Sequence, residues 1–393
     1  MTLESDFIAK LTYPSPEQML DRIERLHRRE VGNGSYWSIQ NEIRPADLFC
    51  YLFARFGPPN GFQNLLRSDD SDNLIHWHWT LKSEHGFVEI TGLNFRTDIL
   101  FTDFVTKVFS QDEFCTIVKM DFKNQGKRMS EVRQKLESWV EFVNPYRRLR
   151  MSVQKLVDEL NDLDVENIKE PDFSGSLNPL MSHPNHLDVW REAGERLHRA
   201  FGLCFGIRSM LPVMAEAFVN LVLFILMRPE LKADSRLRDS AFKQHIDVRI
   251  RRLHLDCIGF EKPVDYSSEV CAKYHSLVNE RNDLLHGNVA VDKLKFNDVY
   301  FAGTVPVFQQ YRTMWHRAFN VQREAVGLDS VMQELEVVDN FIEYVLSCIH
   351  EQFREQVRVM VDRLELGLNT TENRVGVLFA THLVDMFPGP KSA

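Results

Sequence analysis

The chain has 393 residues, of which 44% are hydrophobic and 26% charged, and its formal net charge is −9. This length is enough for two domains and this hydrophobic content is enough to build cores, so a mainly disordered chain is not expected. The acidic balance argues against a protein that coats nucleic acid indiscriminately, because such binding needs a positive field. The six cysteines are scattered without a Cys-x-x-Cys pair, which indicates neither a zinc site nor a disulfide framework and predicts reduced, mostly buried thiols.

Neither end of the sequence carries a recognisable targeting signal. The start, Met-Thr-Leu-Glu-Ser-Asp-Phe, lacks the basic and then apolar pattern of a secretory signal, and the final Pro-Gly-Pro-Lys-Ser-Ala has the composition of a loose tail. We therefore expect a cytoplasmic protein.

Residues 1–165 mix helical and strand patterns, which predicts an α+β domain of no recognised family, with a possible sensor or regulatory role. One helix is expected to begin at Pro16, and another is expected to run from Pro45 to about Gly57. Residues 74–81 and 87–93 predict the two strands of a hairpin.

The next part of this domain is less regular. Residues 114–122 predict a strand or a short helix, and residues 130–143 predict an amphipathic helix.

The segment His76-Trp77-His78-Trp79 lies within the first predicted strand. Because side chains alternate along a strand, the two histidines face one side and the two tryptophans the other. Two histidines can share a cation, but no nearby carboxylate or cysteine completes a ligand set. The segment therefore predicts a polar outer face over an apolar inner face.

Residues 166–188 predict a linker, because prolines, glycine and small polar residues replace the periodic pattern there. From residue 189 to residue 393, helical spacing predicts an all-α bundle. Within it, residues 209–227 form an apolar run that carries Glu216 and Asn220 on one helical face. The run is shorter than the roughly 20 apolar residues of a membrane span and is interrupted by polar groups, which predicts a core helix and no membrane association.

Residues 267–286 predict a single helix that is followed by Gly287, a residue suited to the left-handed position after a last turn. Asn282 and His286 are four residues apart on one face, so the amide can fix the orientation and tautomer of the ring. Arg281 lies about 140° around the helix from His286. A shared site therefore needs the reach of the arginine side chain or a second subunit.

The arrangement Arg-Asn, three residues and then His near a helix end resembles the Arg-x4-His signature of the HEPN superfamily. The apolar run with its embedded Glu216 and Asn220 resembles the helix that precedes the motif in many HEPN domains. The resemblance covers roughly the last half of the chain. It implies a helical bundle that dimerises, with both motifs forming one metal-independent, cofactor-free endoribonuclease site across a twofold axis.

The same resemblance implies a role for each residue of the motif. His286 is the base or acid that moves a proton near neutral pH, and Arg281 is the clamp on the scissile phosphate. Asn282 aligns His286 or the phosphate, and Asp283 supports either side chain. Single-stranded RNA would then be cut by its own 2'-hydroxyl, leaving 2',3'-cyclic phosphate and 5'-hydroxyl ends.

Two outer groups of residues have two interpretations each. Glu216, with Asn220, either orients the guanidinium of Arg281 or is satisfied inside a buried helix. The cluster Arg249, Arg251 and Arg252 either contacts the RNA backbone or forms a solvated helix face.

After the motif, residues 288–308 predict short strands or an extended insertion. The insertion could cover the active cleft, contribute to RNA selection or only decorate the fold. Residues 311–326 and 330–364 return to helical spacing, and the apolar stripe within 337–349 predicts core or dimer face.

Three interpretations of the whole chain follow. The first is an RNA-cleaving effector, such as a toxin or antiviral defence factor, whose N-terminal domain binds a trigger molecule or an antitoxin. The second is a noncatalytic HEPN-type module that binds RNA, a nucleotide or another protein. The third is purely structural, since two cationic side chains near the negative end of a helix stabilise that helix in their own right. The Asn after Arg281, the Gly after His286 and the preceding apolar helix favour the first.

Overall fold

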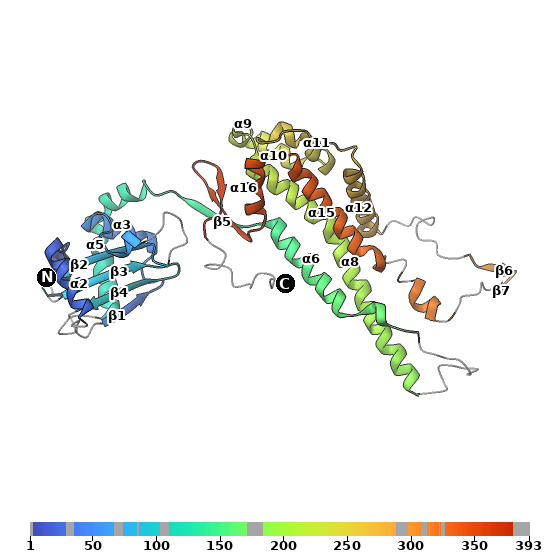
Figure 1. Ribbon diagram of the computed structural model, residues 1–393, viewed down its shortest axis with the longest axis horizontal. Coiled ribbons are helices and arrows are strands. Elements are labelled where there is room, and N and C mark those ends of the chain that lie inside the picture. The colour runs from blue at the N-terminus through green and yellow to red at the C-terminus, as the bar shows by residue number, and fades with distance from the viewer. Residues whose placement is uncertain are drawn as a thin grey trace. The chain divides into compact units, whose positions relative to one another are not determined.

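The computed structural model describes residues 3–28, 35–66, 74–84, 86–102, 110–170, 184–287, 298–307, 313, 315–321, 323 and 327–379 (Figure 1). The chain divides into two compact units, with the boundary between Val140 and Glu141; the first unit also takes in Asn369–Glu372 and the described residues after Gly376. The first unit combines helices with an antiparallel sheet, and the second is mostly helical with small sheets. The predicted fold class, an α+β region followed by a helical bundle with a small extended insertion, is confirmed.

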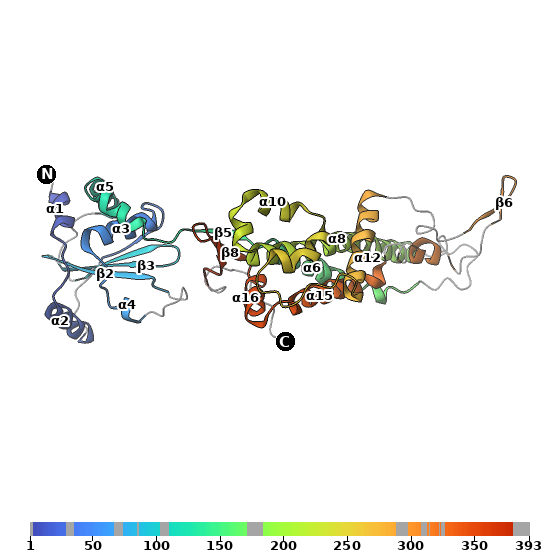
Figure 2. The same ribbon diagram turned by 90° about the horizontal axis from the view of Figure 1, so that it is seen from above.

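The first unit has a helical layer on each face of one sheet. Its four strands are antiparallel in the order β1-β4-β3-β2. Figure 2 shows α1, α3 and α5 on one side of the sheet and α2 and α4 on the other. The elements are α1 Leu3–Lys10, α2 Pro16–His27, β1 Ser35–Ile39, α3 Pro45–Phe56, α4 Gln63–Leu66, β2 Trp77–Ser83, β3 Gly86–Gly92, β4 Thr97–Thr102 and α5 Gln111–Arg133.

Local sequence signals predict four of these elements. The helices expected at Pro16 and Pro45 begin there, and the expected hairpin is the β2–β3 pair, with Trp77 opposite Gly92. Residues 114–122 are helical and belong to α5, which starts at a capping box formed by Ser110 and Glu113.

The helix predicted over residues 130–143 is wrong. Helix α5 ends at Arg133, and strand β5 follows at Trp139–Val143. The sequence Trp-Val-Glu-Phe-Val explains the difference, because aromatic and β-branched side chains favour an extended backbone.

The core of the first unit lies between the sheet and the layer of α1, α3 and α5. Trp79 and Leu81 of β2 point into it and are completely buried, with Leu48 of α3 and Phe114 of α5 packed against them. The apolar inner face predicted for β2 is therefore confirmed.

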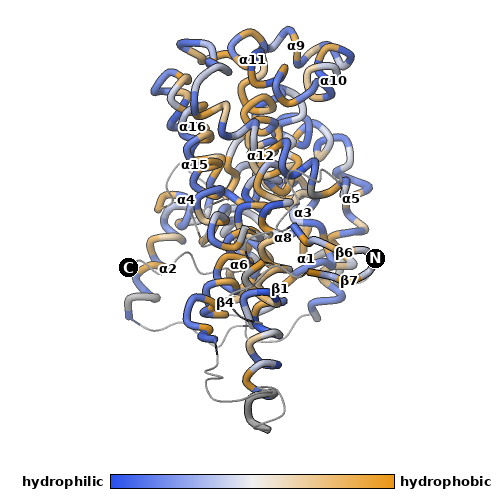
Figure 3. Tube along the Cα trace, turned by 90° about the vertical axis from the view of Figure 1, so that its right-hand side faces the viewer, coloured by the Kyte–Doolittle hydropathy of each residue, from blue (hydrophilic) through white to orange (hydrophobic). Residues whose placement is uncertain are grey.

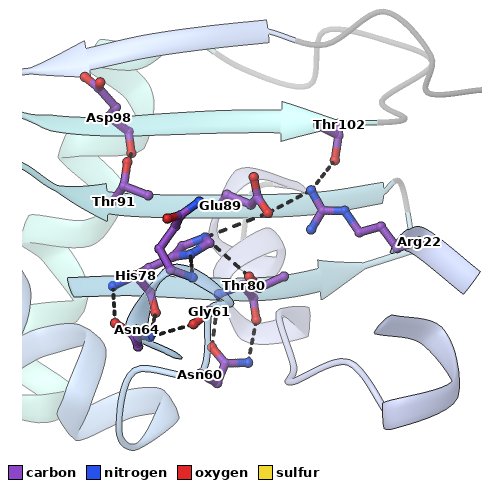
Figure 4. A network of polar contacts seen from close by, with 11 residues as sticks. Arg22, Asn60, Gly61, Asn64, His78, Thr80, Glu89, Thr91, Asp98 and Thr102 are labelled. Atoms are coloured by element: carbon purple, nitrogen blue, oxygen red, sulfur yellow. Dashed lines mark hydrogen bonds and ion pairs between the residues drawn. The ribbon is translucent and has the colours of Figure 1, made fainter. Parts of the chain in front are cut away.

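The opposite face of the sheet is polar, as predicted, but it is not an outer face. His78 is 4% exposed, because the turn before α4 and α4 itself cover it. The backbone N–H of Gln63 donates to Nδ1 of His78 at 3.3 Å, and the N–H of Gly61 donates to its carbonyl at 2.8 Å (Figure 4). A Cβ on Gly61 would lie 2.2 Å from the imidazole, so only glycine allows this close approach.

Helix α2 is attached to the same polar face by a buried cation. Arg22 is 5% exposed, pairs with Glu89 at 2.8 Å and lies 4.6 Å above the ring of Phe87. Its guanidinium also donates to the hydroxyl of Thr102 at 3.4 Å (Figure 4). The ion pair thus links α2 to two strands of the sheet.

Burial lowers the pKa of His78 below its usual value; the Glu89 carboxylate opposes this and the Arg22 cation adds to it. The unfolded chain takes up a proton below about pH 6.5, whereas folded His78 resists it, so stability falls as the pH drops from there towards the folded pKa. We expect denaturation midpoints of the wild type and His78→Asn to converge between about pH 7.5 and pH 5.5, because the variant lacks this proton uptake. If the difference between the two midpoints is the same at every pH, the lowered pKa of His78 is contradicted.

The second unit is a helical bundle with two small sheets. The three-stranded sheet has the order β5-β8-β9, and β6 pairs with β7. The elements after β5 are α6 Pro145–Asp162, a 3-10 turn Val165–Asn167, α8 Pro184–Leu226, α9 Pro229–Ala233, α10 Ser235–Lys243, α11 Ile246–Asp256, α12 Glu269–His286, β6 Tyr300–Ala302, β7 Val305–Val307, a π-helical turn His316–Asn320, a 3-10 turn Leu328–Ser330, α15 Val331–Ser347, α16 Glu351–Val361, β8 Glu365–Asn369 and β9 Arg374–Gly376.

Helix α8 is the centre of this bundle. It has 43 residues, and α6, α11, α12, α15 and α16 all pack against it. Figure 3 shows hydrophobic residues along it. Within the described part of the chain it is the one helix long and apolar enough to cross a membrane, but 61% of its apolar window is buried inside the protein. It therefore serves as the core helix that the apolar run at 209–227 predicts, although it begins much earlier, at Pro184.

The unit boundary lies ahead of the predicted linker at 166–188. Helix α6 packs along α8, so both helices belong to the second unit. Residues 184–188 are the first turn of α8, and residues 171–183 lie outside the described part. A stretch rich in helix breakers marks the end of a helix, but it does not tell whether the flanking helices pack together.

The region after the motif contains the expected strands. Strands β6 and β7 form a hairpin in which every residue is exposed; residues 288–297 and 308 lie outside the described part. The long helical stretch expected at 330–364 is divided into α15 and α16 near His350, whose N–H donates to the carbonyl of Gly259 at 2.7 Å. In the stretch 311–326, the described residues include the π-helical turn. All six cysteines are free and buried, as predicted.

Candidate functional site

Helix α12 carries the Arg-x4-His motif and has well-defined ends. At its start the hydroxyl of Ser268 accepts from the N–H of Cys271 at 3.4 Å. At its end Gly287 adopts the left-handed conformation, with φ 59° and ψ 36°, and its N–H donates to the carbonyl of Asp283. The predicted helix and its glycine stop are confirmed.

One stripe of α12 faces the core of the bundle. Cys271, Tyr274 and Leu277 are buried along it, and the ring of Tyr274 stacks on Phe341 of α15 with centroids 4.2 Å apart. Arg281 follows Leu277 by one turn on the same side and is half-buried. Its guanidinium is therefore directed toward the bundle rather than free in water.

The contacts of Arg281 leave much of its charge available. Nη1 donates to Oδ1 of Asn282 at 2.8 Å. Nε is buried and has no hydrogen-bond partner, and among the described residues no carboxylate lies within ion-pair distance of the side chain. The amide of Asn282 thus positions Arg281, and not His286 as the spacing of four residues predicts.

His286 lies on a different side of the helix. It is the last residue of α12 and is exposed, about 140° around the axis from Arg281. No hydrogen bond from Arg281 or His286 to a helix carbonyl is found in the described part of the chain, and the cap is made by the backbone of Gly287. Arg281 and His286 therefore do not cap the end of α12 through their side chains. Asp283 is half-buried beside them.

Glu216 and Asn220 hold Arg249 of α11 instead of Arg281. The two terminal nitrogens of Arg249 donate to Oδ1 of Asn220 and Oε1 of Glu216, and its Nε donates to the carbonyl of Gln244 at 2.8 Å. Arg249 is only 8% exposed. Of the two interpretations of Glu216 and Asn220, satisfaction by neighbouring groups inside the bundle is confirmed, and orientation of Arg281 is wrong, because α11 brings Arg249 closer to them.

Tyr274 connects this ion pair with Arg281. Burial raises the pKa of the Tyr274 hydroxyl, and the Glu216 carboxylate raises it further, while the Arg249 and Arg281 cations oppose the shift. Glu216, Arg249 and Arg281 therefore each lie within electrostatic range of the Tyr274 hydroxyl. The hydroxyl is buried and has no hydrogen-bond partner in the described part. The spacing of seven residues between Tyr274 and Arg281 was the available sequence signal for this proximity.

The three arginines of α11 have three different environments. Arg249 is buried, so it cannot contact an RNA backbone as predicted. Arg252 donates to both carboxylate oxygens of Asp256, at 3.1 and 2.9 Å, which neutralises much of its charge. Arg251 is exposed. The predicted basic cluster is thereby reduced to one outward-facing cation.

No family model, curated protein or solved structure matches the chain. Among the residues that the structure describes there is no group of three or more His, Cys, Asp or Glu side chains that could hold a metal ion. The assignment of a function therefore depends on the chemistry of the site itself.

The Glu216–Arg249 pair gives a stability prediction. Glu216→Ala leaves a buried guanidinium without its counter-charge, so we expect a loss of about 3 kcal/mol, at the lower end of the usual range because the Glu216 side chain is 38% exposed. The matched control is Asp188→Ala on the same helix, which breaks the exposed Asp188–Arg191 pair and should cost less than about 1 kcal/mol. Urea denaturation measures both. If both variants lose the same free energy of unfolding, the buried pair stabilises the protein no more than the exposed pair does.

Proposed function

We propose that the second unit is a metal-independent endoribonuclease of the HEPN type, which cleaves single-stranded RNA and acts as a homodimer. The main support for the proposal is the environment of the Arg281 side chain. Its guanidinium is half-buried, positioned by Asn282, unpartnered at Nε and without a described counter-ion, at the end of a helix that finishes in an exposed histidine. A preoriented cation without an internal anion is suited to an external one such as a phosphate.

The chemistry follows from the properties of these two side chains. His286 removes the proton of a ribose 2'-hydroxyl, and the 2'-oxygen forms a bond to the adjacent phosphorus. The bond from phosphorus to the 5'-oxygen breaks, and that oxygen takes a proton from an imidazolium. Arg281 cannot exchange protons, so its part is to hold the phosphate and stabilise the added negative charge. The products are a 2',3'-cyclic phosphate and a 5'-hydroxyl.

The separation of the two side chains on one helix supports the dimer. Arg281 lies on the buried side of α12, and His286 lies on an exposed side about 140° away. Two copies of the helix related by a twofold axis bring Arg281 of one protomer toward the partner's His286. In this arrangement Asn282 fixes the guanidinium, and Asp283 supports the end of the helix.

We also propose a biological role for this cleavage. An RNA-cutting unit joined to a separate α/β unit fits an effector, such as a toxin or antiviral defence factor in the cytoplasm, whose activity an antitoxin or trigger molecule controls through the first unit. The alternative is a noncatalytic HEPN-type module that binds RNA, a nucleotide or a protein. The two proposals differ in one property, which is cleavage.

Cleavage of single-stranded RNA in the presence of EDTA is the direct test. We expect His286→Ala to lower the rate about 100- to 10,000-fold through loss of proton transfer. Arg281→Ala should lower it about 100- to 1,000-fold through loss of charge stabilisation. Arg191→Ala and His198→Ala, which alter exposed residues of α8, should leave it unchanged.

End-group analysis of the products completes this test. Cyclic phosphate ends that disappear in both site variants support the nuclease. Equal cleavage by the wild type and both variants would rule out the proposed site, and RNA binding without any cleavage would favour the noncatalytic module.

Subunit mixing tests whether the pair acts across the dimer. Differently tagged Arg281→Ala and His286→Ala chains are co-expressed, and the dimers are assayed together. Random pairing makes half of them mixed, and each mixed dimer keeps one of two complete pairs, so about a quarter of wild-type activity should return. If both side chains act within one protomer, the mixture stays as inactive as its parents.

A further inference from the structure

Arg251, Tyr266 and His275 form a cluster, here called the flanking cluster, beside the first half of α12. The guanidinium carbon of Arg251 lies 4.3 Å from the centre of the Tyr266 ring. The Tyr266 hydroxyl and Nδ1 of His275 are 3.0 Å apart and share a hydrogen bond. Arg251 and His275 are exposed, and Tyr266 is half-buried. These contacts preorganise a cation, an aromatic ring and an imidazole at the surface.

The flanking cluster shares a helix face with His286. At 3.6 residues per turn, His275, Asn279, Asn282 and His286 fall within a sector of about 60°. No carboxylate of α12 lies in that sector, because Glu269, Glu280 and Asp283 fall on the next side of the helix, starting about 40° beyond it. The sector from His275 to His286 is therefore a continuous polar face of α12 that carries no acidic side chain of this helix.

The two ends of this face are a fixed distance apart. His275 and His286 are eleven positions apart, and with a rise of 1.5 Å per residue this gives about 16 Å along the axis. A single RNA strand that crosses this distance contains a few nucleotides.

We propose that RNA cleaved at His286 continues along this face of α12, and that the flanking cluster binds a nucleotide a few positions from the scissile linkage. The proposal rests on the proposed nuclease function and adds a substrate subsite to it. Arg251 binds the phosphate of that nucleotide. The outer surface of the guanidinium and the ring of His275 provide flat surfaces on which an unpaired base stacks.

The electrostatic environment of Arg251 is compatible with this role. Stacking on Tyr266 orients the planar group and leaves its N–H edge available for two parallel bonds to a phosphate. The Asp265 carboxylate lies within electrostatic range of Arg251, but no ion pair joins Arg251 to a carboxylate within the described residues. Asp265 accepts two hydrogen bonds from Ser267, which lower the pKa of its carboxyl group, and the Arg251 cation lowers it further. Arg251 thus differs from Arg252, which Asp256 already neutralises.

The test uses full-length protein and a single-stranded 2'-O-methyl oligonucleotide of about twelve nucleotides, which binds but cannot be cut. We expect Arg251→Met to weaken binding about 5- to 10-fold and to reduce the slope of log affinity against log salt by about 0.7, the contribution of one phosphate contact. Arg251→Lys, which keeps the charge without the planar stack, should lie between. Arg252→Met is the matched control and should change neither quantity. Thermal unfolding of each variant confirms that it is folded.

Cleavage assays with two substrate lengths separate this proposal from the nuclease. Arg251→Met should raise KM for a long RNA while leaving cleavage of a dinucleotide unchanged, because a dinucleotide does not reach the flanking cluster. If the wild type cuts RNA but Arg251→Met behaves like Arg252→Met on both lengths, the subsite is refuted and the nuclease stands. If the wild type binds the oligonucleotide through Arg251 but cuts no RNA, the nuclease is refuted and the binding face stands. Absence of any RNA binding refutes both.

Discussion

The buried guanidinium of Arg249 is the constraint around which the helical unit is arranged. A cation with 8% exposure must be compensated inside the protein, and Glu216, Asn220 and the carbonyl of Gln244 do so. These contacts tie α11 to the central helix α8. They also occupy the one carboxylate on this part of α8, and among the described residues Arg281 of the neighbouring helix has no ion-pair partner.

The two sides of α12 then acquire different properties. The buried side carries Tyr274 and Arg281 and contributes to the packing of the bundle, so a substitution there affects stability as well as chemistry. The exposed side carries His275 and His286 and touches solvent. One helix cannot present both sides to a single small ligand. The proposed dimer therefore supplies the second side chain from the partner, and the proposed RNA path follows the exposed side alone.

The first unit uses the same physical solution in a sheet. Arg22 is buried between Glu89 and the ring of Phe87, and the imidazole of His78 lies within 3.8 Å of the same carboxylate. The sheet thus has an apolar face that forms the core and a polar face whose groups satisfy one another. Such a layer fixes the position of α2, because sliding the helix would separate the buried charges.

Features that depend on residues a few positions apart could be predicted from the amino-acid sequence alone. Ser268 and Gly287 set the ends of α12, Pro45 starts α3, and the alternation in β2 sends Trp79 into the core. The angle between Arg281 and His286 also follows from helical geometry alone. Each of these signals is local, so no knowledge of the packing was needed.

The contacts between side chains of different helices and strands could not be predicted in this way, because they depend on how the elements pack. Glu216 pairs with Arg249 rather than Arg281 because of how α11 docks on α8, and Asn282 turns to Arg281 because that side chain is held against the bundle. The burial of His78 depends on a turn that precedes its strand by more than ten residues. A polar side chain can form hydrogen bonds with many different groups. Packing determines which of these groups comes within reach, so it also determines the hydrogen-bond partner.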